Sequence, residues 1–327
     1  MTRTPHGASN GVCSSVLDSV RVWPAVSIAS RAAEALARCG GAARVHSVFA
    51  RSFNIALDND SLITVVKHGR GGMPCAILVG ADDSASFEQI IEPESEVRVA
   101  SDALMIPAAG VCIDLHKAAV ISYRRSTVVK ANAAALRAGV EAASDALIAA
   151  ATGEGLTPLL ACVEELAAGR CSRTFTDALC ARGAAAICTL MNGLRDDDQR
   201  AIIAGVNGLC GLGIGLTPSG DDVLTGLTGT LAALGRLRAN DALAVEILRC
   251  APTATTAVAA AYLEYAAHAE VSDILGEFIG AIASAERMRI SAAAADLGQM
   301  GSTSGGETAL GVLLAFHHLN WAARNQA

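Results

Sequence analysis

The stretch of this 327-residue chain with the clearest chemical character is a glycine-rich loop that runs into an apolar helix. It reads Gly-Leu-Gly-Ile-Gly-Leu-Thr-Pro-Ser-Gly-Asp-Asp over residues 211–222, and the helix is expected to continue through Leu237. Three glycines let the backbone bend and approach a ligand closely. Ser219 suits the N-cap, and Asp221 and Asp222 fall in the first helical turn, where the helix dipole favours carboxylates. Alone, the stretch is equally typical of a well-capped helix after a glycine turn.

A second stretch, residues 298–311, has the same character and also runs into an apolar helix. The two stretches align without gaps as Ser-Gly-x-(Asp/Glu)-x-x-x-Gly. The matched pairs are Gly213 with Gly298, Thr217 with Ser302, Ser219 with Ser304, Gly220 with Gly305, Asp222 with Glu307 and Gly226 with Gly311. Agreement at this level of detail indicates an internal pseudo-repeat rather than two unrelated helix starts.

The spacing within each copy predicts how the copies meet. The carboxylate lies four residues before a glycine, on the same helix face. A glycine inside a helix costs about 1 kcal/mol relative to alanine, so Gly226 and Gly311 need a packing reason. We expect the two helices to touch at these glycines. That contact would bring Asp222 and Glu307 together, with both loops at the same end.

Such an arrangement predicts a pocket lined by loop N–H groups, hydroxyls and acids. Helix N-termini and glycine loops favour anions such as phosphate or carboxylate. The expected substrate- or anion-binding residues are Gly215, Thr217, Ser219, Gly220, Ser302, Ser304 and Gly305. The candidate catalytic residues are Asp221, Asp222 and Glu307. These acids could serve as a general base, and Asp221 and Asp222 could instead hold Mg²⁺.

Weaker candidates lie elsewhere in the chain. Thr255 and Thr256 open a predicted helix, where they are typical of a cap but could also point a hydroxyl into the pocket. Asn54 is a polar residue within a strand-like run, and Arg70 lies in a basic glycine turn. A structural asparagine and a solvated hairpin are the simpler interpretations, and anion binding is the alternative. Gly-Glu-Gly-Leu-Thr-Pro at 153–158 lacks Ser-Gly-Asp-Asp and is interpreted as a structural turn.

The N-terminal part of the chain is expected to be β-rich. Residues 1–20 are small and polar and are expected to be disordered, and the β-rich domain is expected over 21–126. A short helix over 26–39 should open that domain. Runs rich in β-branched residues, separated by turn signals, then predict strands over 45–49, 52–57, 62–66, 76–79, 96–100 and 111–113. Short strands at this spacing favour a small antiparallel sandwich or barrel.

From 127 to 327, Ala and Leu recur at helical spacing. Helices are predicted over 131–150, 157–169, 174–191, 197–210, 221–237, 241–250, 254–267, 271–285, 287–297 and 307–323. Pro158, Pro218 and Pro252 are expected in connections or first turns, where proline is tolerated. The predicted fold class is therefore α+β, with a small antiparallel β-rich domain followed by a mostly helical domain that carries both loops.

Composition excludes several classes of protein. Apolar residues make up 52% and charged residues 17%, which rules out a disordered chain. A net charge of −7 argues against nucleic acid or an anionic membrane as the partner. Mean hydropathy is high at +0.41, yet no apolar run is long enough to span a bilayer and no signal peptide is evident. We therefore expect a cytoplasmic protein that buries apolar surface in an oligomer or complex.

The motifs resemble those of the bacterial AllH family, which is associated with oxamate carbamoyltransferase. The resemblance lies in Gly-Leu-Thr-Pro-Ser-Gly-Asp-Asp at 215–222, Thr255-Thr256 and the Ser-Gly-x-acid loop at 304–307. The layout is also similar, with an Asn in a Phe-Asn-Ile run of a β-rich part and a helical part after it. The resemblance covers roughly residues 40–320. This chain has Ser302 and Glu307 where the family pattern Gly-His-Ser-Ser-Gly-x-Asp has His and Asp.

The resemblance implies a subunit that acts with an acyl-CoA-synthetase-like FdrA/AllF protein and an AllG protein. The implied reaction joins oxamate and carbamoyl phosphate to give oxalurate and phosphate, and runs toward carbamoyl phosphate in purine (allantoin) catabolism. The leading hypothesis is thus an enzyme subunit for carbamoyl transfer, with phosphate, carbamoyl phosphate or oxamate bound at the two loops. The alternative is a non-catalytic structural or regulatory subunit whose glycine loops pack helices. A stand-alone hydrolase is the weakest hypothesis.

Overall fold

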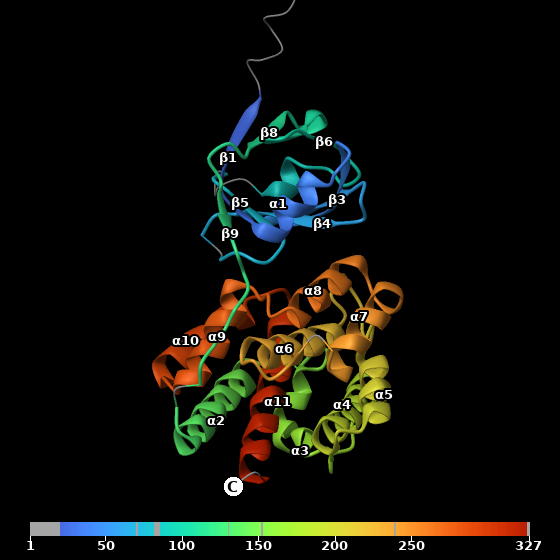
Figure 1. The fold of residues 1–327 in the computed structure, drawn as a ribbon, viewed down its shortest axis with the longest axis vertical. Helices are drawn as coiled ribbons and strands as arrows, with labels where there is room; N and C mark the ends of the chain where they lie inside the picture. The colour runs from blue at the N-terminus through green and yellow to red at the C-terminus, as the bar shows by residue number, and fades with distance from the viewer. Residues whose placement is uncertain are drawn as a thin grey trace, which may run out of the picture. The chain divides into compact units, whose positions relative to one another are not determined.

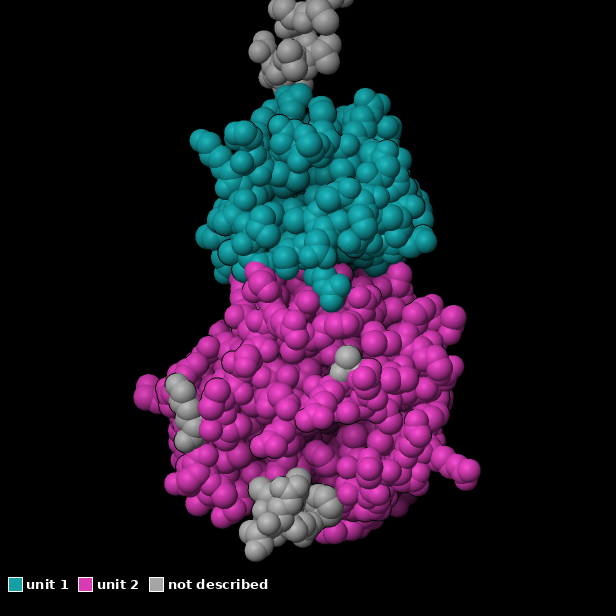
Figure 2. All heavy atoms as spheres, in the orientation of Figure 1, with its two compact units in different colours: residues 1–70, 75–121 teal, residues 71–74, 122–327 magenta. Residues whose placement is uncertain are grey.

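The computed structural model describes residues 20–69, 71–81, 86–129, 131–151, 153–238 and 240–325. The prediction of disorder for the N-terminus and the candidate Arg70 therefore fall outside the described residues, apart from Val20. The chain divides into two compact units, drawn as a ribbon in Figure 1 and coloured separately in Figure 2. Unit 1 comprises Met1–Arg70 and Cys75–Ile121, and unit 2 comprises Gly71–Pro74 and Ser122–Ala327.

Unit 1 is a closed, mostly antiparallel sheet. Its strands are β1 (Arg21–Ala29), β2 (Ala42–Val48), β3 (Ser52–Leu57), β4 (Leu62–Lys67), β5 (Ala76–Val79), β6 (Glu96–Val99), β7 (Ala103–Ile106), β8 (Val111–Asp114) and β9 (Ala119–Ile121). The order is β5-β4-β3-β2-β6-β7-β8-β1-β9, and β5 also pairs with β1, which closes eight strands into a barrel. Helix α1 (Ser30–Ala37) and the 3₁₀ turns η1 (Phe87–Gln89) and η2 (Pro107–Ala109) lie between strands.

The predicted α+β class is confirmed, with two corrections inside unit 1. The pairs β1–β8, β1–β9 and β4–β5 are parallel, so the sheet is mixed. The helix expected over 26–39 begins only at Ser30, because the residues before it belong to β1. That strand pairs with three neighbours along its length, and this tertiary pairing outweighs the helix-forming composition.

Unit 2 is helical. Its elements are α2 (Ala133–Ala150), η3 (Thr157–Cys162), α3 (Val163–Ala167), α4 (Ala178–Asp196), α5 (Gln199–Leu209), α6 (Ser219–Ala233), α7 (Ala242–Ala254), α8 (Ala257–Ala267), α9 (Asp273–Ser284), α10 (Arg287–Gly298) and α11 (Ser304–Asn325). Each predicted helical segment corresponds to one or two of them. Pro252 was expected in a connection or a first helical turn, but it lies inside α7 near the C-terminal end of that helix.

The core of unit 2 is built around α6 and α11, which lie in the middle of the helical unit in Figure 1. Along α6 every residue except Thr225 is buried, which is the burial pattern of a fully enclosed helix rather than an amphipathic one. Among the described residues, no helix combines the length and apolarity that crossing a membrane would require.

Candidate functional site

Two glycines set how closely α6 and α11 approach. A Cβ on Gly226 would lie 2.0 Å from the Thr308 carbonyl oxygen, and a Cβ on Gly311 would lie 2.1 Å from that of Val223. Only hydrogen fits at either position, so the predicted glycine contact between the two helices is confirmed. The first turns of both helices consequently meet at one end.

The loops before α6 and α11 make equivalent backbone hydrogen bonds. Their structural alignment nevertheless differs from the ungapped sequence alignment of residues 213–226 with 298–311. Gly220 N–H donates to Leu212 O and Gly305 N–H donates to Met300 O, at 2.8 and 2.9 Å. The left-handed glycines that follow these acceptors are Gly213 and Gly301, with φ of 124° and 62°. Gly213 therefore corresponds to Gly301 rather than to Gly298, which ends α10.

The second loop is three residues shorter than the first, because Ser219 is six residues after its glycine and Ser304 only three. Thr217 and Ser302 keep the same spacing from their serines, but they have different surroundings. Thr217 Oγ1 lies 3.0 Å from Ser304 Oγ, so these two hydroxyls join the loops. Ser302 is exposed.

A third glycine turn borders this contact, although the sequence suggested only a structural role for it. We call residues 211–222 and 301–307, together with the turn at 153–157, the twin-loop site. A Cβ on Gly155, whose φ is 60°, would lie 2.1 Å from Glu307 Oε1 and 3.3 Å from Ser219 Oγ. The next amide, Leu156 N–H, donates to Glu307 Oε1 at 2.8 Å. The shared Gly-x-Gly-Leu-Thr-Pro letters were the signal that could have placed this turn in the site.

Glu307 is held on both sides. Its side chain is fully buried, and Oε2 accepts from Thr303 Oγ1 at 3.0 Å while Oε1 accepts from Leu156 N–H. These bonds compensate for the loss of water around the carboxylate. Glu307 therefore ties the second loop to the third glycine turn, and both of its oxygens are engaged.

Asp221 is engaged in the same way. Its Oδ1 accepts from Gly211 N–H at 3.0 Å, and its Oδ2 accepts from Thr255 Oγ1 at 2.5 Å. Burial raises the pKa of Asp221, and these hydrogen bonds oppose the shift. The residue joins the start of the first loop to the end of α7.

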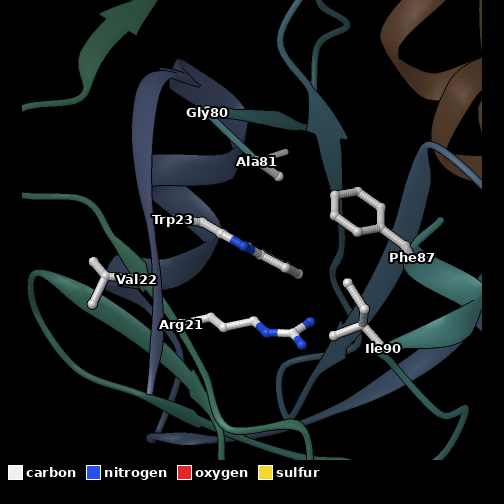
Figure 3. Close-up of a pocket in the computed structure, with 7 residues that line it drawn as sticks. All are labelled: Arg21, Val22, Trp23, Gly80, Ala81, Phe87 and Ile90. Atoms are coloured by element: carbon white, nitrogen blue, oxygen red, sulfur yellow. The ribbon is translucent and has the colours of Figure 1, made fainter. Parts of the chain in front are cut away.

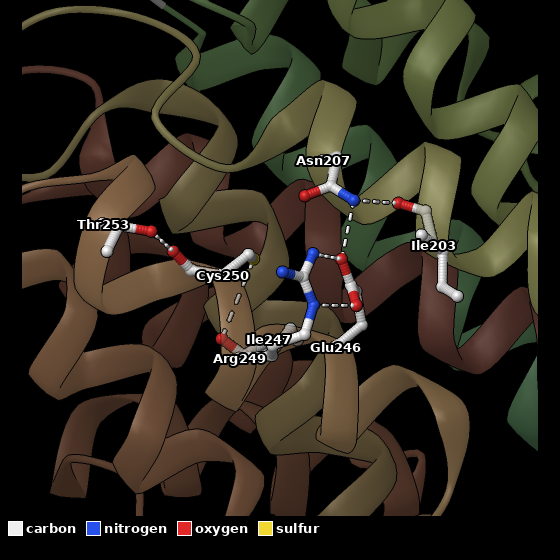
Figure 4. A network of polar contacts seen from close by, with 7 residues as sticks. All are labelled: Ile203, Asn207, Glu246, Ile247, Arg249, Cys250 and Thr253. Atoms are coloured by element: carbon white, nitrogen blue, oxygen red, sulfur yellow. Dashed lines mark hydrogen bonds and ion pairs between the residues drawn. The ribbon is translucent and has the colours of Figure 1, made fainter.

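Thr256 completes this support. Its hydroxyl accepts from Ala259 N–H at 3.1 Å as the N-cap of α8, and it also donates to the Leu216 carbonyl oxygen. Thr255 and Thr256 thus hold the first loop, residues 211–222, in position by hydrogen bonds to Asp221 and to the Leu216 carbonyl oxygen. The position of α7 is fixed in turn by Glu246, which accepts from Arg249 and from Asn207 of α5 (Figure 4).

Asp222 differs from its neighbours because one of its oxygens has no partner. The residue is 5% exposed, and Oδ2 is buried without a hydrogen-bond partner among the described residues. Burial raises the pKa of Asp222 well above its ordinary value, and the nearby Glu307 and Asp221 carboxylates raise it further. Hydrogen bonds from Ser304 and Thr217 offset part of that shift. Asp222 therefore retains its proton to a higher pH than an exposed aspartate does.

The remaining candidates lie around or outside this cluster. Ser219 is buried at the first position of α6. The residue before it, Pro218, occupies the N-cap, so the prediction of Ser219 as the cap is wrong. Gly215 has φ of 94° at an exposed loop tip, next to Ile214, which is 92% exposed. Gly220 and Gly305 carry no side chain because a Cβ would meet the Leu209 and Leu297 carbonyl oxygens at 2.0 and 1.8 Å.

Asn54 is a satisfied structural residue of unit 1. Its amide donates to Ser47 Oγ at 2.9 Å and accepts from Thr64 Oγ1 at 2.7 Å, across neighbouring strands. Both bonds lie within the sheet, and the twin-loop site lies in unit 2. Asn54 therefore has the simpler of its two predicted roles.

The acids do not fit a Mg²⁺ site. Both Asp221 oxygens already accept from protein donors, and burial opposes the charged form of Asp222 that a metal ligand requires. Within the described ranges no group of three His, Cys, Asp or Glu side chains has an arrangement that could hold a metal ion. What the site offers instead is a buried carboxyl group among hydroxyls, where two helix N-termini converge.

Comparison with known proteins agrees with the motifs. A family model described as oxamate carbamoyltransferase subunit AllH matches residues 209–316, which contain both loops, α6 and most of α11. A model described as the AllH family N-terminal domain matches residues 24–120, which include β2 to β8 and most of β1 and β9. No curated protein and no solved structure matches the chain. Two models of one family match in the expected order over both units, and the chain therefore belongs to the AllH family.

Proposed function

We propose that this chain is a subunit of an oxamate carbamoyltransferase-like complex and that its twin-loop site binds the small substrate. The family description names such a subunit. The observation that carries the site assignment is the buried Oδ2 of Asp222, which has no hydrogen-bond partner in the described part of the chain. A buried polar atom without a partner costs free energy, so it is retained where a ligand can satisfy it.

The substrate class follows from the groups around Asp222. Oxamate and oxalurate carry a carboxylate beside an amide. The carboxylate suits the converging N-termini of α6 and α11 and the hydroxyls of Thr217, Ser219 and Ser304. The amide nitrogen then faces Asp222. A phosphate or carbamoyl phosphate would use the same hydroxyls.

Asp222 can serve as the proton carrier of carbamoyl transfer. When a phosphate oxygen attacks the carbamoyl carbon of oxalurate, the new C–O bond forms as the C–N bond breaks. The leaving nitrogen takes the Asp222 proton, the proton of the attacking hydrogen phosphate passes to the Asp222 carboxylate, and the products are carbamoyl phosphate and oxamate. In the opposite direction the same carboxylate accepts the proton that the oxamate nitrogen loses. A pKa raised by burial favours this exchange, because it lets the carboxyl hold a proton at higher pH than an exposed aspartate can.

The proposal extends to the setting of the reaction. Partner subunits of the FdrA/AllF and AllG types would supply the rest of the complex, and the reaction would serve purine catabolism in the cytoplasm. The second candidate function is a structural or regulatory subunit. It is favoured by Asp221 and Glu307, because protein donors occupy both oxygens of each carboxylate.

Activity of the reconstituted complex distinguishes these two functions. Asp222→Asn keeps the shape of the side chain and loses the titrating proton, so it should assemble normally but turn over at least about 100-fold more slowly. Asp145→Asn, at an exposed position on α2, is the matched control and should retain full activity. Full activity of a correctly assembled Asp222→Asn complex would favour the structural role.

A further inference from the structure

We propose that a cavity at the open edge of the unit 1 barrel binds a planar organic anion, namely a carboxylate attached to an aromatic ring. The cavity has a volume of about 530 Å³ and is lined by Arg21, Val22, Trp23, Gly80, Ala81, Phe87 and Ile90 (Figure 3). This volume is in the range of small-molecule sites, which is about 300–1,000 Å³. The inference concerns unit 1 and does not depend on the function proposed for the twin-loop site.

The strand pairing explains why an opening exists here. Residues 21–24 of β1 pair with β8, whereas pairing with β5 begins only at Ala25 opposite Val79. One further hydrogen bond, from Gly80 N–H to Pro24 O at 2.9 Å, ends the pairing between β1 and β5. The first residues of β1 and the chain after β5 thus diverge, and side chains rather than backbone line the space between them.

The walls of the cavity are rigid aromatic rings. Trp23 is 6% exposed and Phe87 is fully buried, and their ring centroids are 5.0 Å apart at an interplanar angle of 41°. Phe53 meets the same Phe87 ring edge-on at 5.2 Å. Because packing fixes these rings before any ligand arrives, a planar ligand loses little free energy to ordering the site.

Arg21 is the charged side chain among the described residues that line the cavity. Arg21 and Trp23 are two residues apart on β1, and Figure 3 shows both side chains extending toward Phe87 and Ile90, whereas Val22 points the opposite way. Lys67 Nζ, buried inside the barrel, lies 5.2 Å from the centre of the Phe87 ring. The neighbouring Glu88 carboxylate accepts from Ser86 Oγ at 3.2 Å.

These features select a ligand with one flat face and one anionic end. A guanidinium presents a planar fork that matches a carboxylate with two parallel hydrogen bonds. Trp23, which is 6% exposed, presents the accessible part of an aromatic ring beside that fork, and the buried Phe87 ring holds it in place. A neutral aromatic amide could pack against the aromatic side chain but could not form the charge-assisted hydrogen bonds with the guanidinium. An aliphatic carboxylate such as acetate could form those hydrogen bonds but has no ring to pack.

Fluorescence of Trp23 tests the proposal in the full-length chain. The sequence has two tryptophans, so Trp321→Phe leaves Trp23 as the only indole. We would titrate this variant with benzoate, with the neutral isostere benzamide and with acetate. Benzoate should change the emission saturably, and benzamide and acetate should bind at least about tenfold more weakly.

Substitution of the arginine separates specific binding from general charge. Arg21→Gln in the same background should weaken benzoate about tenfold or more, to the level of benzamide. Arg98→Gln, at an exposed position on β6 of the same unit, should leave benzoate binding unchanged. The proposal is wrong if benzoate produces no saturable change, if benzamide binds equally well, or if the two arginine substitutions have the same effect.

Discussion

Gly226 of α6 and Gly311 of α11 occupy equivalent positions, and each leaves room for the backbone of the other helix. This mutual contact brings two helix N-termini together with three buried acids in their first turns. Both oxygens of Asp221 and of Glu307 accept hydrogen bonds from the protein, whereas one oxygen of Asp222 has no partner among the residues that the structure describes. The division of roles follows from the surroundings of each acid, since all three sit in similar sequence contexts.

Alanine at either contact glycine should destabilise unit 2. A methyl at Gly226 would overlap the Thr308 carbonyl oxygen, so the helices must separate, at a cost of about 1–3 kcal/mol or more. Gly280→Ala on α9 is the control, because its Cβ would come no closer than 3.9 Å to another atom. That change should be neutral or stabilising by up to about 1 kcal/mol. Urea unfolding of wild type, Gly226→Ala and Gly280→Ala measures both effects. Equal stability of Gly226→Ala and wild type would refute the close contact.

The raised pKa of Asp222 predicts a pH dependence of stability. In the unfolded chain this carboxyl ionises near its ordinary value of 3.8, whereas the folded protein holds the proton to higher pH. Its contribution is therefore complete below that value and declines as pH rises toward the folded pKa. Asp222→Asn should reduce the fall in unfolding free energy between acidic and neutral pH, and Asp145→Asn should not. Identical slopes for all three proteins would show that Asp222 ionises normally.

Glu307 should behave as a positioning residue of the third glycine turn. Glu307→Leu removes the acceptor of the buried Leu156 N–H and should cost about 1–3 kcal/mol. Glu307→Gln retains an acceptor for that amide and should cost less. Hydrogen exchange of the Leu156 amide provides the specific measurement, with much faster exchange expected in the leucine variant. Unchanged protection of that amide in Glu307→Leu would contradict this role.

The threonine that holds Asp221 has a matched counterpart inside α6. Thr255→Val removes the donor to Asp221 Oδ2 and should destabilise the protein by about 1 kcal/mol. Thr228 is buried with its hydroxyl unpartnered among the described residues, so Thr228→Val should be neutral or stabilising. Thermal unfolding of the two variants should therefore shift in different directions. A larger loss for Thr228→Val would overturn the assignment of these two hydroxyls.

Much of this arrangement could be predicted from local patterns. Helical periodicity located the elements of unit 2, and the paired glycines located the contact between α6 and α11. The parallel pairs of β1 could not be predicted, because partner choice depends on segments distant in the chain. The three-residue difference between the loops also escaped notice, since it preserves the motif after each serine and changes only what precedes it.

The individual roles of the acids required the structure. Two adjacent aspartates at a helix start look alike in sequence, yet Asp221 meets Gly211 and Thr255 while Asp222 faces the second loop. Their side chains diverge because neighbouring positions on a helix point in different directions. The partner of Glu307 lies 151 residues away at Leu156, a separation that no local pattern reveals.

The most direct test of the account is calorimetric titration of the purified chain with oxamate, with phosphate as a second ligand. Wild type and Asp222→Asn should both bind, because the asparagine retains a polar group of the same shape. A Thr217→Val/Ser304→Ala variant should lose about tenfold or more in affinity. Binding that is absent in wild type, or unchanged by loss of both hydroxyls, would contradict the assignment of substrate binding to the twin-loop site.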